Sequence, residues 1–108
     1  PSAYSFYTYT DMQLLVGFNF TALLIDCEGC IENLFEGTSV PLRELLQNVR
    51  VILLEADMPR GATSSCKVDC VDYAKWENRF IEAGFKVDLK TVDIRYPFIY
   101  HYAFVKVR

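Results

Sequence analysis

Short apolar runs, separated by stretches with helical spacing, form the main hydrophobic pattern of the chain. The runs over residues 21–25 and 49–54 are mostly aliphatic, and an acidic residue follows each of them directly. A continuous apolar run of this length, bounded by polar residues, is typical of a strand that is buried on both faces, as in a parallel sheet. Residues 86–94, where apolar and polar side chains alternate with one shift of phase, predict a third strand, and residues 99–107 predict a fourth.

Helical spacing of apolar residues fills the intervals between these runs. A capping box predicts a short helix over residues 10–17, and helical turns are expected over 31–35 and 41–46. A longer helix follows the second strand, with Asp69 or Asp72 as its cap. The residues expected on its core face are Tyr73, Trp76, Phe80 and Ile81.

This alternation of strands and helices predicts an α/β fold. Right-handed βαβ crossovers between the strands would give a mostly parallel sheet. The link between the last two strands covers only residues 95–98, which favours a final antiparallel hairpin at the sheet edge. No linker or low-complexity tract interrupts the sequence, so we expect residues 1–108 to form a single α/β unit.

Composition and charge narrow the classes of function. Hydrophobic residues make up 52% of the 108 residues and aromatic residues 15%, which excludes a disordered tail. The net charge of −3, without a run of Lys or Arg, argues against binding of nucleic acid or of an acidic membrane surface. No apolar run approaches the ~20 residues that span a bilayer. The start, Pro-Ser-Ala-Tyr, lacks a signal peptide and an initiator Met, which favours a cytoplasmic or organellar location and a piece of a longer polypeptide.

Four cysteines, Cys27, Cys30, Cys66 and Cys70, form a C-x2-C pair and a C-x3-C pair. Three interpretations stay open. The four thiolates can hold a structural zinc ion in tetrahedral geometry, although no zinc knuckle surrounds either pair. The thiols can be reduced and partly buried, or a disulfide can form, either between Cys66 and Cys70 or across the loops.

Acidic residues stand at the carboxyl ends of the first two predicted strands. Asp26 with Glu28, and Glu55 with Asp57, lie two apart, so in an extended chain each pair projects to one side. Ligands bind at the carboxyl ends of strands in open α/β sheets. These carboxylates are therefore candidates to hold a divalent metal, to bind a cationic or hydroxyl-rich ligand, or to act as a general base. The alternative is that they cap helices or pair with arginines, namely Arg43 and Arg60.

Two further residues near these strand ends carry weaker signals. Gly29 supplies the tight turn from strand to helix, and the following helix N-terminus can face an anion. His101 is the only histidine and lies between Tyr100 and Tyr102, which face the other way in a strand. We expect a structural or surface histidine there rather than a catalytic base.

The segment Ala22-Leu-Leu-Ile-Asp-Cys-Glu-Gly-Cys-Ile-Glu-Asn-Leu-Phe35 resembles the Ile-Asp-x-Glu-Gly-x-Glu stretch of FkbM-type methyltransferases, which use S-adenosylmethionine. Ile31 is one extra residue between the Gly and the last Glu, and Leu24 stands where many members carry Lys. The run that ends in Glu55 is similar to the family's next strand. Other similar segments are Tyr9 to Gln13, Cys70 to Tyr73, Gly84-Phe85 and the closing strand Tyr100 to Val105.

This resemblance implies the C-terminal half of a Rossmann-like methyltransferase sheet, with strands four to seven of the complete domain. It implies catalytic roles for Asp26 and Glu28, and it places Gly29, Glu55 and Asp57 near the substrate or the cofactor. S-adenosylmethionine is the cofactor of the parent domain. The sequence has no Gly-x-Gly turn, so we expect an incomplete domain that lacks its N-terminal cofactor-binding half and is inactive alone.

An incomplete sheet would leave the strand over Ala22–Asp26 as an exposed apolar edge. We expect the rest of the same polypeptide, a partner chain or a second copy to cover it, and we expect neither nucleic acid nor a membrane span. Two other functions stay open. One is a non-catalytic scaffold or interaction subunit that retains half of the methyltransferase fold, and the other is a zinc-stabilised structural module.

Overall fold

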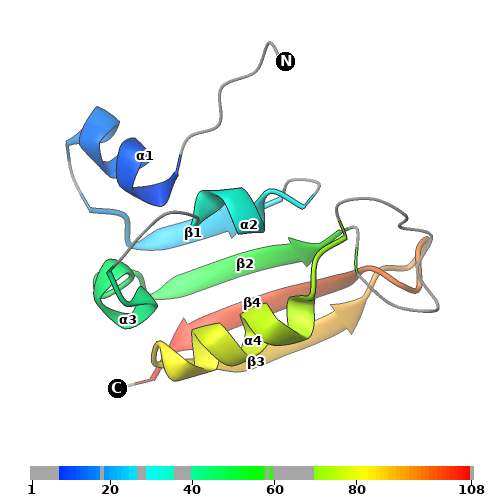
Figure 1. Cartoon of the computed structure of the whole chain (residues 1–108). Helices are drawn as coiled ribbons and strands as arrows, with labels where there is room; N and C mark the ends of the chain where they lie inside the picture. The colour runs from blue at the N-terminus through cyan, green and yellow to red at the C-terminus, as the bar shows by residue number, and fades with distance from the viewer. Residues whose placement is uncertain are drawn as a thin grey trace, which may run out of the picture.

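The computed structural model describes residues 8–17, 19–26, 29–35, 40–57, 59 and 70–107. In these residues, helices and strands alternate over most of the chain, as the hydrophobic pattern predicted (Figure 1). In chain order the elements are α1 (Tyr9–Val16), β1 (Ala22–Ile25), α2 (Ile31–Leu34), α3 (Leu42–Leu45), β2 (Val51–Ala56), α4 (Tyr73–Glu82), β3 (Phe85–Val92) and β4 (Tyr100–Lys106).

The strands form one open sheet in the order β1-β2-β4-β3. β1 pairs with β2 in parallel, whereas β4 is antiparallel to both of its neighbours. The α/β class and the final antiparallel hairpin are therefore confirmed, but the sheet is mixed, and a mostly parallel pairing is not confirmed. β1 lies at one edge, as expected for the strand that begins at Ala22.

Among the described residues, one face of the sheet is buried and the other carries exposed side chains. Ile52, Leu54 and Ala56 of β2 are buried, while Leu53 between them is 46% exposed and Leu24 of β1 is 73% exposed. The prediction that both apolar runs form strands buried on two faces is therefore wrong. Alternation along a strand sends every second side chain to the other face of the sheet. Figure 1 shows α2 and α4 on the same side of the sheet, so the side chains on that side are the ones they cover.

The core between the helices and the sheet is rich in aromatic residues. Phe80 of α4 is fully buried and its ring contacts those of four aromatic neighbours. These are Phe35, Trp76, Phe85 and Phe104. Tyr73 of α4 is also buried, so three of the four residues predicted for its core face are confirmed. Ile81 is exposed instead, because it lies one position beyond the buried stripe.

Side chains and turns fix the ends of the elements. Thr8 is the N-cap of α1 and forms a capping box with Asp11, so this helix begins earlier than predicted. Gly17 ends it in the left-handed region, with a φ of 75°. Asp72 accepts a hydrogen bond from the backbone N–H of Lys75 and caps α4, while Asp69 lies outside the described residues.

A bulge between Val87 and Leu89 interrupts the pairing of β3 with β4. Before the bulge, Val87 packs against the core, and after it Leu89 is exposed. The predicted shift of phase in this strand is real, although it comes earlier than the sequence pattern indicated. No helix in the described part of the chain is long and apolar enough to cross a membrane.

Candidate functional site

The carboxyl ends of β1 and β2 bring acidic side chains together. Parallel pairing puts Ile25 beside Leu54, so Asp26 and Glu55 follow at the same edge of the sheet. The carboxyl groups of Asp26 and Glu55 are hydrogen-bonded to each other. With Asp57 they form a group in which one oxygen of each carboxylate lies within 4.8 Å of the others. The sequence predicted that two acidic strand ends converge, and the structure brings Asp26, Glu55 and Asp57 together at this edge.

The hydrogen bond between two carboxyl groups requires that one of them be protonated. This bond to Asp26 is the largest cause that raises the pKa of Glu55, followed by burial and by the charges of Asp57 and Asp26, while the charge of His101 lowers it. Together they raise the pKa of Glu55 from 4.5 to about 7. Two close carboxylates repel each other when both are ionised, so the pair retains a proton near neutral pH.

His101 of β4 joins this site from the other side of β2. It is the register partner of Glu55, and its Nε2 atom lies 2.9 Å from Oδ2 of Asp93. One ligand atom of each of Glu55, Asp93 and His101 lies within 4.8 Å of the others. The antiparallel pairing of β4 with β2 therefore carries the histidine to the acidic edge.

Asp93 anchors both His101 and the β3–β4 link. Its Oδ1 accepts hydrogen bonds from the backbone N–H groups of Arg95 and Tyr96, at 2.8 and 3.1 Å. The bond to His101 and then these backbone bonds lower the pKa of Asp93 from 3.8 to about 2. Asp93 is therefore an anion at neutral pH, held in one position beside the imidazole ring.

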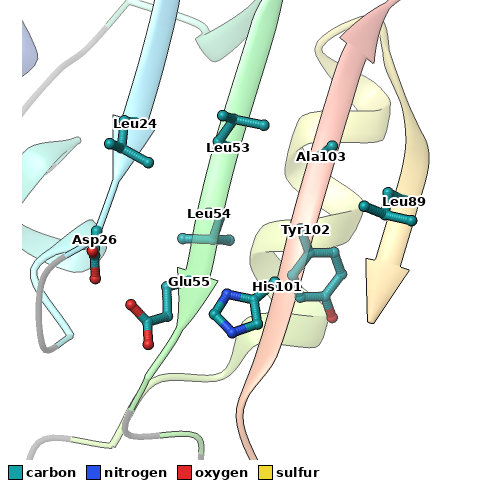
Figure 2. A pocket seen from close by; sticks show the side chains of 9 residues that line it. All are labelled: Leu24, Asp26, Leu53, Leu54, Glu55, Leu89, His101, Tyr102 and Ala103. Atoms are coloured by element: carbon teal, nitrogen blue, oxygen red, sulfur yellow. The ribbon is translucent and has the colours of Figure 1, made fainter. Parts of the chain in front are cut away.

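A cavity of about 300 Å3 extends from these polar groups across the sheet surface (Figure 2). Its polar end is formed by Asp26, Glu55 and His101, and the rest of its wall is apolar or backbone. Figure 2 shows the polar side chains at one end of the strands, with the leucines farther along them. The apolar part is lined by Leu24, Leu53, Leu54, Leu89, Tyr102 and Ala103.

No family model, curated protein or solved structure matches the chain. The chemistry of the site is therefore argued from its own groups. Because its pKa is about 7, Glu55 is partly ionised at neutral pH, and the ionised form can accept a proton from a hydroxyl group. A general base works best when its pKa is near the working pH. Carboxylate oxygens with one imidazole also offer the ligand types that divalent cations bind.

Gly29 and Arg43, the other described residues that the sequence indicated for the site, do not belong to the acidic group. Gly29 has a φ of 76°, which confirms the tight turn between β1 and α2. Glu28 and Arg60 lie outside the described residues. Arg43, the proposed alternative partner of the acids, instead donates a hydrogen bond to the backbone carbonyl of Glu82.

Cys30 and Cys70 are disulfide-bonded. The interpretation as reduced thiols is therefore wrong for these two residues. A disulfide sulfur is no thiolate, so neither residue offers the ligand that a four-cysteine zinc site needs. Cys27 and Cys66 lie outside the described residues.

The sequence predicted a structural or surface role for His101 and offered no motif that points to Asp93. The alternation of Tyr100, His101 and Tyr102 already indicated that the histidine faces away from the core. Its position beside Glu55 depends on the register of β4 against β2, which no local pattern encodes. Asp93 falls within the strand predicted over residues 86–94 and belongs to no motif in the sequence.

Proposed function

We propose that the chain is part of an S-adenosylmethionine-dependent O-methyltransferase domain of the FkbM type and forms its acceptor side. The observation that carries this proposal is the hydrogen-bonded pair of Asp26 and Glu55 at the carboxyl ends of two parallel strands. Asp26 belongs to the segment that resembles the family's acidic motif. Glu28 of the same motif keeps the role that the resemblance implies.

Transfer of a methyl group to a hydroxyl requires positioning of the acceptor and removal of its proton. Glu55 in its ionised form accepts the hydroxyl proton, and its hydrogen bond to Asp26 then stabilises the protonated form. His101, held by Asp93, contacts the acceptor from β4. S-adenosylmethionine supplies the methyl group in such domains, but the chain has no Gly-rich strand-to-helix turn to bind it. Cofactor binding is therefore assigned to the remainder of the parent domain.

The direction of the strands supports this assignment. β4 is antiparallel to β2 and to β3, so β1, β2 and β3 all run in one direction. This arrangement agrees with the half-sheet that the resemblance implies, in which a final antiparallel hairpin closes a set of parallel strands. The position of β1 at the edge leaves room for a further strand beside it.

The test measures methyl transfer by the longer polypeptide that contains this chain, with radiolabelled S-adenosylmethionine and a panel of hydroxylated acceptors. Glu55→Gln removes the base but keeps the size of the side chain, and we expect it to lower kcat by about 10²-fold or more. Asp88→Asn, an exposed carboxylate in β3, is the matched control and should leave kcat unchanged.

Calorimetric titration separates this proposal from its alternatives. The 108-residue chain alone should not bind S-adenosylmethionine, whereas the longer polypeptide should. If the longer polypeptide does not bind it, the function is that of a non-catalytic scaffold, which the exposed leucines of the sheet would serve. A zinc-stabilised module is disfavoured by the disulfide bonds of Cys30 and Cys70.

A further inference from the structure

The cavity at the acidic edge has a polar end beside an apolar floor, on the sheet face opposite the core. Glu55 and His101 are register partners, and two residues earlier on β2, Leu53 is the partner of Ala103. Side chains two apart on a strand point to the same face, so the polar and the apolar pair are neighbours, about 7 Å apart. A ligand that reaches Glu55 and extends along β2 therefore also contacts Leu53.

The apolar floor extends across all four strands. Leu24 of β1 pairs with Leu53 of β2, which also pairs with Ala103 of β4. Ala103 in turn pairs with Leu89 of β3. Strands with ~4.8 Å spacing give this floor a width of about 14 Å. The three leucines are between 46% and 73% exposed, so their side chains are open to a ligand (Figure 2).

The floor offers a ligand apolar contacts rather than hydrogen bonds. β2 and β4 are the inner strands and pair with a neighbour on each side, so their backbone N–H and C=O groups bond within the sheet. Hydroxyl groups placed over the leucines would lose their bonds to water without replacement, which is costly. A compound with hydroxyl groups on all sides, such as a sugar, therefore fits this floor poorly.

The polar end of the cavity carries negative charge. Asp26 and Glu55 share one proton, so the pair retains a negative charge, and Asp93 beside His101 is an anion at neutral pH. The described residues that line the cavity include no Lys or Arg. A carboxylate or phosphate of a ligand would therefore be repelled at this end.

We propose that the methyl acceptor is a compact apolar alcohol without an anionic group, which places its hydroxyl at Glu55 and its apolar body on the floor. This inference rests on the function proposed above and names the class of its acceptor. The volume of about 300 Å3 lies at the lower end of the range for small-molecule sites, ~300–1,000 Å3. Two linked rings match such a volume, and their burial against the leucines supplies the binding energy.

The test measures the binding of three compounds to the 108-residue chain by nitrogen-15 NMR, without S-adenosylmethionine. Cyclohexylcyclohexanol has two linked rings and one hydroxyl. Cyclohexylcyclohexanecarboxylate has a carboxylate in place of that hydroxyl, and trehalose has two linked rings with hydroxyl groups throughout. The alcohol should shift the signals of Leu53 and His101, with a Kd at least about tenfold lower than the Kd of either other compound.

Two variants test whether the floor is the binding surface. Leu53→Asn replaces an apolar side chain by a polar one of similar size, and it should raise the Kd of the alcohol about fivefold or more. Leu14→Asn is the matched control, because this leucine of α1 is 78% exposed and does not line the cavity. It should leave the Kd unchanged. Equal affinity for the alcohol and either other compound would overturn the proposal, and so would no binding or a Kd that Leu53→Asn leaves unchanged.

The same compounds separate this inference from the function on which it rests. Methyl transfer by the longer polypeptide to trehalose but not to the alcohol would overturn the acceptor class and leave the methyltransferase function in place. Binding of the alcohol to the chain, without transfer to any hydroxylated compound by the longer polypeptide, would contradict the methyltransferase function and keep the ligand class.

Discussion

The hydroxyl of Tyr73 donates a hydrogen bond to the backbone carbonyl of Asp57, which ties the first turn of α4 to the chain that follows β2. Tyr73 is buried, and burial is the largest cause that raises its pKa, so the hydroxyl keeps its proton and remains a donor. The core and the acidic edge are therefore connected through a single side chain.

Tyr73→Phe removes this donor and keeps the ring. The carbonyl of Asp57 loses a partner, and we expect the free energy of unfolding to fall by about 1–2 kcal/mol. Urea denaturation followed by circular dichroism measures the change. Tyr96→Phe is the control at an exposed tyrosine and should be neutral. An equal loss in both variants would show that the bond to Asp57 is not the cause.

The aromatic core predicts a large contrast between adjacent residues of α4. Phe80→Ala removes a fully buried ring that contacts four others, and it should cost about 3–5 kcal/mol. Ile81→Ala changes an exposed neighbour and should cost less than about 1 kcal/mol. Chemical denaturation of both variants measures the difference, and similar costs would contradict the burial of α4 against the sheet.

The pair of Asp93 and His101 predicts the behaviour of the protein in acid. Because the pKa of Asp93 is lowered from 3.8 to about 2, its contribution to stability is present above pH 3.8 and is lost as the pH falls through 2. His101→Gln removes the largest cause of this shift, so the pKa of Asp93 should rise towards 3.8. Acid unfolding should then begin at a higher pH than in the original protein. An unchanged acid midpoint would contradict the pairing.

The disulfide bonds predict the chemistry of two cysteines. In denaturant without a reductant, iodoacetamide should not modify Cys30 or Cys70, and after reduction it should modify both. Mass spectrometry of peptides reads this directly, and a label on either residue before reduction would contradict the structure. Reduction should also lower the stability by about 2–4 kcal/mol.

The strands and helices of this chain follow from its local pattern, but the faces of the sheet do not. The runs that contain Leu24 and Leu53 are continuously apolar, and such a run looks the same whether one face or both are covered. Their exposure is decided by which elements pack on the sheet, and the described helices α2 and α4 lie on the same face of it. The local pattern therefore predicts the strands and helices but overestimates the burial of Leu24 and Leu53.

Part of the candidate site could likewise be predicted from the sequence, and part could not. The meeting of Asp26 with Glu55 could be predicted, because the carboxyl ends of parallel strands meet at one edge. The arrival of His101 could not, since it requires β4 to lie between β2 and β3 in a particular register. The position of Asp93 depends in addition on the bulge in β3 and on the turn that follows this strand.

The central claim is that Asp26 and Glu55 share a proton at the carboxyl edge of the sheet. A raised carboxyl pKa favours the folded state below pH 4.5, and this contribution is lost as the pH rises through about 7. Replacement of Asp26 by Ala should remove the largest part of it, while burial and the charge of Asp57 remain, so the two proteins should differ most in stability at low pH. The loss of the hydrogen bond to Asp26, and of its charge, should also bring the pKa of Glu55 down towards its ordinary value.

The most direct measurement is the titration of the Glu55 side-chain carboxyl by carbon-13 NMR. In the original protein we predict a pKa of about 7, with a fall towards 4.5 in Asp26→Ala and no change in the control Asp88→Asn. A Glu55 that titrates near 4.5 in the original protein, or whose pKa is the same in Asp26→Ala, would contradict the shared proton and the base proposed for this site.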